Sequence, residues 1–103
     1  MNRIEKLESF LRDSPNDSFL KHALALEYIK LGDDSKAKDL FTGLLTADPG
    51  YVGSYYHLGK LLERTGNKAD AITTYEKGIL IAGKAGDRHS ASELQGALDE
   101  LQS

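Results

Sequence analysis

The residues with the clearest potential for chemistry are three histidines, His22, His57 and His89. A zinc site takes three or four ligands in a tetrahedron, and its paired histidines lie a few residues apart on a helix or loop. No histidine of this chain has a second one three or four residues away, and there is no cysteine. The sequence therefore predicts no metal site.

Two serines, Ser90 and Ser92, lie next to or near His89, a combination that invites comparison with a nucleophile and its base. We expect all three on one helix, and no glycine-framed turn presents either serine as a nucleophile. The glycines of segment 78–86 follow no strand, and the segment lacks the lysine and hydroxyl residue that end a phosphate-binding loop. We therefore predict that the chain is not an enzyme and takes no cofactor.

Charge and composition exclude further classes of function. The 13 basic and 16 acidic residues are interspersed and give a formal charge of −3, which provides no basic footprint for nucleic acid. Glu5, Glu8 and Asp13 interrupt the apolar residues of the amino-terminal segment, so it predicts neither a signal peptide nor a membrane span. Without cysteine, nothing indicates an oxidising compartment. We expect a cytoplasmic protein.

Helical periodicity runs through the chain, and proline and glycine divide it. Pro15 and Pro49 end the segments before them, while Gly32 and Gly66 are followed by polar residues that start a helix. None of the segments alternates with the period of a strand. The helices are expected near residues 2–12, 17–31, 34–47, 51–65, 68–83 and 87–101.

An internal repeat accounts for this spacing. An offset of 34 superimposes Pro15 on Pro49, Leu24 on Leu58, Gly32 on Gly66, Ala37 on Ala71, and Phe41 on Tyr75. Small residues are needed where two helices approach closely, and we assign this role to Ala25, Ala37, Gly59 and Ala71. In the last helix the match shifts to an offset of 36, because two residues are inserted near 82–86.

These residues resemble the tetratricopeptide repeat, a helix-turn-helix unit of about 34 residues. The second repeat matches or closely replaces its pattern with Tyr55, Leu58, Gly59, Leu62, Ala71 and Tyr75. The first repeat does so with Leu24, Ala25, Tyr28, Ala37, Phe41 and Pro49. It departs from the pattern at Lys21, where the large aromatic is missing, and we expect Phe19 or Leu20 to fill that space.

The resemblance implies an all-α fold, a right-handed superhelical solenoid of about six helices in antiparallel pairs. Residues 1–103 would form one domain, with an amino-terminal half repeat over 1–15, repeats over 18–51 and 52–85, and a capping helix over 87–103. Such a fold implies a protein-interaction module, an adaptor or scaffold, that binds a peptide or protein segment in its concave groove.

The family's groove-facing positions, carried onto this chain, identify the expected binding residues. They are Phe19, His22, Leu26, Lys30, Tyr56, Lys60, Glu63 and Arg64, with Ser90 and Leu94 as a continuation on the last helix. Lys30, Lys60 and Arg64 suggest an acidic partner, although cations at the carboxyl ends of helices also suit the helix dipole without any ligand.

A structural spacer or self-association is the alternative function. Ile79, Leu80 and Ile81 are consecutive on one helix, so at least one should reach the surface, and Phe10 beside Leu11 leaves the first helix apolar on two sides. Either feature would suit a homo-oligomer, or further repeats if the chain is part of a longer array. The sequence does not identify the partner.

Overall fold

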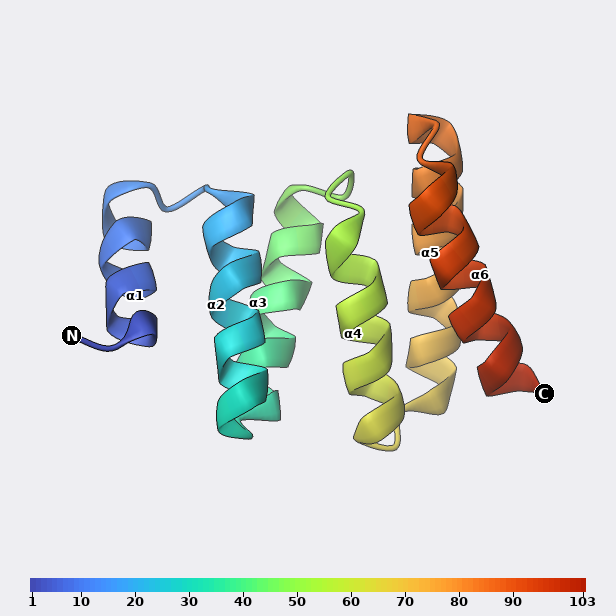
Figure 1. The fold of residues 1–103 in the computed structure, drawn as a ribbon, viewed down its shortest axis with the longest axis horizontal. Coiled ribbons are helices and arrows are strands. Elements are labelled where there is room, and N and C mark those ends of the chain that lie inside the picture. The colour runs from blue at the N-terminus through green and yellow to red at the C-terminus, as the bar shows by residue number, and fades with distance from the viewer. The chain divides into compact units, whose positions relative to one another are not determined.

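The computed structural model describes all of residues 1–103 and contains six α-helices and no strand (Figure 1). The helices are α1 (Arg3–Asp13), α2 (Ser18–Leu31), α3 (Asp34–Ala47), α4 (Gly53–Arg64), α5 (Lys68–Ala85) and α6 (Arg88–Gln102). They fall into two compact units, Met1–Asp48 and Pro49–Ser103. The prediction of an all-α chain with about six helices is confirmed.

The helix ends follow from local side-chain chemistry. Asp17, Asp33 and Asp87 stand immediately before α2, α3 and α6, and a carboxylate oxygen of each accepts the amide N–H three residues on, at 3.0–3.1 Å. Such caps stabilise a helix by about 1 kcal/mol. Gly32 and Gly86 follow α2 and α5 with φ of 84° and 72°, the left-handed conformation that ends a helix and favours glycine.

In the first unit α2 is the central helix, with α1 and α3 packed against it. The hydroxyl of Ser18 donates to the Asp48 carboxylate at 2.7 Å and so ties the start of α2 to the end of α3. Ala25 and Ala37 are completely buried, as expected for the small residues at a close helix contact. The buried apolar residues of this unit are Leu7, Ala23, Leu24, Ala25, Tyr28, Ala37, Phe41, Leu44 and Leu45.

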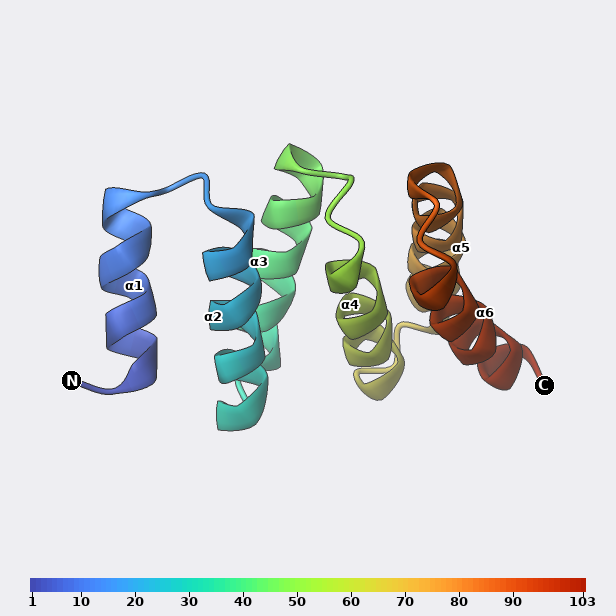
Figure 2. The same ribbon diagram turned by 45° about the horizontal axis from the view of Figure 1, so that its top comes forward.

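In the second unit α4, α5 and α6 pack on one another, as Figures 1 and 2 show. A Cβ atom on Gly59 of α4 would lie 2.1 Å from Cε1 of Tyr75, so only glycine fits there. A Cβ atom on Gly78 of α5 would lie 2.7 Å from Cβ of Tyr55. The role assigned to Gly59 from the sequence is confirmed, and Gly78 makes a second close contact.

The helix α6 carries a different residue at the position that Gly59 occupies in α4. With the offset of 36 this position is Gln95, which is exposed and donates to the Asp99 carboxylate at 2.9 Å. Leu94, next to it, is buried against Gly78, with its Cδ1 3.0 Å from where a Cβ would stand. The helix α6 therefore packs on α5 through the face that bears Leu94, and the neighbouring face bears the polar residue Gln95.

One expectation from the sequence was wrong in detail, and one is narrowed. We expected a helix end near Gly83, but α5 continues to Ala85 and ends at Gly86. A glycine inside a helix costs only about 1 kcal/mol, and Lys84 and Ala85 are both good helix formers, so the helix absorbs the inserted residues. Of the two residues expected to fill the space beside Lys21, Leu20 is half-buried, whereas Phe19 is 65% exposed.

None of the six helices combines the length and apolar character that crossing a membrane requires.

Candidate functional site

Four of the predicted binding residues lie on α2: Phe19, His22, Leu26 and Lys30. Their spacings of three and four residues place them along one side of the helix. Phe19 and Lys30 are exposed, whereas His22 and Leu26 are half-buried. The His22 ring packs edge-on against Phe41 of α3 with 5.7 Å between ring centroids, so it also takes part in the α2–α3 packing.

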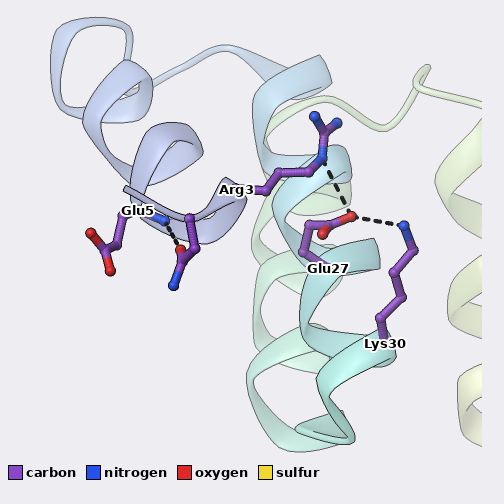
Figure 3. Close-up of polar contacts among 5 residues, drawn as sticks. Arg3, Glu5, Glu27 and Lys30 are labelled. Carbon is purple, nitrogen blue, oxygen red and sulfur yellow. Dashed lines mark hydrogen bonds and ion pairs between the residues drawn. The ribbon is translucent and has the colours of Figure 1, made fainter.

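The ammonium group of Lys30 is held by a carboxylate of its own helix. Its Nζ lies 3.1 Å from Oε2 of Glu27, and the same oxygen lies 3.4 Å from Nε of Arg3 in α1 (Figure 3). The Glu27 side chain is only 16% exposed, whereas Arg3 and Lys30 remain largely in solvent. Glu27 therefore joins α1 to α2 and fixes one end of the predicted surface.

The other four predicted residues lie on α4, and three of them form one chain of contacts. Lys60 Nζ lies 5.7 Å from the centroid of the Tyr56 ring and 3.7 Å from Oε2 of Glu63. The buried hydroxyl of Tyr75 on α5 donates to that same glutamate oxygen. Burial, and then the hydrogen bond to Glu63, raise the pKa of Tyr75 above its ordinary value. Arg64 is exposed in the last turn of the helix.

A pocket opens between α4 and α6 beside this chain of contacts. Its volume is about 260 Å³, and its lining consists of Val52, Gly53, Tyr56, His57, Ser90, Glu93 and Leu94. Burial lowers the pKa of His57, and the nearby Glu93 carboxylate opposes this only in part. Ser90 and Leu94, expected as a continuation of the binding surface, do lie at this pocket.

The histidines do not form a metal centre. No group of three or more histidine, aspartate or glutamate side chains is placed to hold a metal ion. His89 instead lies 3.0 Å from Oε1 of Glu93, one turn along α6, and both side chains are more than half exposed. Each histidine therefore has a local packing or pairing role.

Within each unit the predicted residues share a helix face, and a single groove continuous over both units stays a prediction. Sequence reasoning missed Arg3, Glu27 and Glu93. Glu27 could have been found from its spacing of three residues to Lys30, and Glu93 from its spacing of four to His89. No signal in the sequence joined Arg3 to Glu27, because they lie on different helices.

Comparisons with known proteins agree with this architecture. A family model described as the tetratricopeptide repeat matches residues 20–51 and 52–84. The chain is 29% identical over 98 residues to the TPR repeat-containing protein PA0015 of Pseudomonas aeruginosa, covering 95% of this chain and 93% of that protein. A tetratricopeptide repeat domain protein from Salinibacter ruber has 46% identity and a TM-score of 0.80, covering 84% of this chain and 96% of that one. Protein BPP2914 from Bordetella parapertussis has 28% identity and a TM-score of 0.84, covering 99% of this chain and 89% of that one.

Proposed function

The chain belongs to the tetratricopeptide repeat family, whose fold is a general module for protein–protein interaction, and we propose that it is an adaptor or scaffold that binds a segment of another protein. Proteins of this family are generally scaffolds without enzymatic activity. The division into a half repeat, repeats over 18–51 and 52–85, and a capping helix over 87–103 belongs to the same proposal, as does a cytoplasmic location.

The observation that carries this proposal is the chain of contacts on α4. Tyr56 and Lys60 are partly exposed, yet Lys60 is held between the Tyr56 ring and Glu63, and Tyr75 in turn holds Glu63. Exposed side chains that are already ordered lose little conformational entropy when a partner binds. An aromatic ring beside a cation is also a combination enriched among residues that dominate binding energy. This surface of α4 is therefore suited to recognition.

The contacts of Lys30 and Lys60 bear on the charge expected of the partner. Lys30 and Lys60 suggested an acidic partner, but each ammonium group lies within 4 Å of a carboxylate of its own helix, at 3.1 Å from Glu27 and 3.7 Å from Glu63. Neither lysine therefore contributes a surplus positive charge. The two lysines therefore give no support to an acidic partner.

A pull-down from the native cell lysate tests the proposal. The binding variant Tyr56→Ala with Arg64→Glu changes the α4 surface. A matched control, Leu31→Ala with Lys77→Glu, likewise truncates one apolar side chain and reverses one charge, at exposed positions of α2 and α5. We expect proteins captured by the wild type and the control to be lost from the binding variant, with circular dichroism showing that both variants fold. Equal capture by all three would contradict the assignment of α4.

Self-association is the second candidate, and two exposed apolar side chains favour it. Phe10 of α1 is 55% exposed and Leu80 of α5 is 65% exposed, which confirms that at least one of the three apolar residues in 79–81 reaches the surface. Sedimentation equilibrium over a wide concentration range distinguishes the two functions. A monomer throughout would contradict self-association, whereas a dimer that Phe10→Ala or Leu80→Ala dissociates would support it.

A further inference from the structure

The pocket between α4 and α6 differs in chemistry from the lysine-bearing surface beside it. None of its seven lining residues is a lysine or an arginine. Glu93 supplies a carboxylate, and Ser90 supplies a hydroxyl that donates to Asp87 at 2.7 Å and keeps its capacity to accept. The Tyr56 ring forms an aromatic wall, and Val52 and Leu94 add apolar surface. The polar groups of the lining are therefore mainly acceptors.

The imidazole of His57 adds to this acceptor character. Burial lowers its pKa below the ordinary value for histidine, so the ring is neutral at neutral pH. A neutral imidazole has one donor and one acceptor nitrogen, whereas the protonated ring has donors only. His57 therefore brings no positive charge to the pocket, and the Glu93 carboxylate makes the net charge of the lining negative.

This lining excludes two kinds of ligand side chain. An anionic group would face Glu93 with no cation in the lining to balance it. An aliphatic side chain would cover the carboxylate without giving it a hydrogen bond, which costs free energy. A cationic side chain balances the charge of the carboxylate and donates a hydrogen bond to it. It can also lie against an aromatic ring. Tyr56 already accepts one such contact, from Lys60 at 5.7 Å.

Among cations, a guanidinium group fits better than an ammonium group. Its planar fork of five N–H donors matches a carboxylate in two parallel hydrogen bonds and stacks on aromatic rings, whereas an ammonium group is a compact and strongly hydrated charge. The current partner of Glu93 is His89, in a pair that is 85% and 53% exposed and so easily replaced. The lining residues all belong to one unit, Pro49–Ser103.

We propose that the pocket between α4 and α6 binds an arginine side chain of the partner segment, with Glu93 accepting from the guanidinium group and the Tyr56 ring packing against it. The identity of the arginine as a partner's residue rests on the proposed function. The affinity of the pocket for a guanidinium group does not, since it follows from the lining alone.

The test is an NMR titration of the whole chain with N-acetyl-arginine amide. We expect saturable shift changes at Tyr56, His57 and Glu93, with a Kd on the order of millimolar because the probe is small. N-acetyl-citrulline amide has nearly the same shape without the charge, and N-acetyl-lysine amide has the charge without the planar fork. Both should bind several-fold more weakly. If the citrulline or the lysine probe bound as tightly as the arginine probe, the assignment of a guanidinium group would be overturned.

Two variants of α6 complete the test. Glu93→Gln should weaken binding of the arginine probe by about tenfold, the factor expected for a hydrogen bond to a charged group. Glu100→Gln removes one negative charge from an exposed position of the same helix outside the lining and should leave binding unchanged. Equal weakening by both variants, or no saturable shifts with the wild type, would overturn the proposal. Saturable binding combined with a failed pull-down would instead contradict the proposed function and leave the pocket assigned.

Discussion

The first helices of the two repeats, α2 and α4, each carry a glutamate that pairs with a lysine, but the third residue that contacts the glutamate differs. In each, a glutamate holds a lysine three residues away, Glu27 with Lys30 and Glu63 with Lys60. Glu27 is also bound by Arg3, a largely exposed side chain from α1. Glu63 is instead bound by the buried hydroxyl of Tyr75, from the second helix of its own repeat. The glutamate–lysine pair of α4 is therefore tied to the core of its repeat, whereas that of α2 is tied to a surface arginine.

The cores of the two repeats differ accordingly. At the equivalent positions the first repeat pairs Ala25 with Phe41, and the second pairs Gly59 with Tyr75. The Tyr75 ring lies so close to position 59 that a Cβ would overlap it, at 2.1 Å from Cε1 and 2.6 Å from Cζ. The two residues therefore depend on each other. Because Gly59 has no Cβ, the Tyr75 ring fits against α4, and from this position its hydroxyl reaches Glu63.

The largest effect is expected from Gly59→Ala, which would make the second repeat like the first. The added Cβ overlaps a buried ring that cannot swing into solvent, so overpacking should lower the free energy of unfolding by roughly 1–3 kcal/mol. Urea denaturation measures the change. Gly83→Ala is the control, because Gly83 lies in α5 with open space around it and should raise stability by up to about 1 kcal/mol. A Gly59→Ala variant as stable as the wild type would contradict the close contact.

Tyr75→Phe tests the hydroxyl without changing the ring. Losing the hydrogen bond to the Glu63 carboxylate should cost about 1.5 kcal/mol at neutral pH. The pKa of Tyr75 is raised in the folded protein, so above about pH 10 the unfolded state binds fewer protons than the folded state. The free energy of unfolding then falls as the pH rises. Denaturation at pH 9 and 11 should show a smaller fall in Tyr75→Phe than in the wild type, and equal falls would contradict this assignment.

The smallest effect is expected from Arg3→Ala, which removes the contact peculiar to the first repeat. Because Arg3 is 64% exposed, its ion pair with Glu27 should contribute about 0–1 kcal/mol. The difference from the wild type should shrink in about 1 M salt, where charges are screened over a few ångströms. Lys6→Ala, at an exposed position of the same helix, serves as the control. A loss well above 1 kcal/mol that salt does not reduce would mean that Arg3 stabilises α1 by packing rather than by charge.

The fold could be predicted from the sequence because its determinants are local and repeat. Proline, glycine and aspartate divide the chain into helices, and the observed helix ends lie within about two residues of those expected. The offset of 34 then showed which small residues face one another. The end of α5 was missed because Gly83 looks like a helix stop, although a single glycine costs a helix too little to end it.

The candidate site was predictable only at the level of helix faces. Spacing along one helix was enough to group Phe19 with Lys30, and Tyr56 with Lys60. It could not show that Arg3 reaches Glu27 from another helix, or that α6 packs on α4 so that Glu93 and His57 share a pocket. These contacts depend on how helices dock, and in the second unit that depends on the close approaches at Gly59 and Gly78, of which the repeat pattern indicated only the first.

Gln95 bears on how a repeat array of this kind can grow by gene duplication. Copying a 34-residue segment and placing the new second helix after α6 would set its large aromatic side chain against Gln95, where α4 offers Gly59. The new pair could not close to the same separation until that codon had changed to one for a small residue. Gln95→Gly or Gln95→Ala is thus the substitution an engineer would make before packing a further helix on this face of α6.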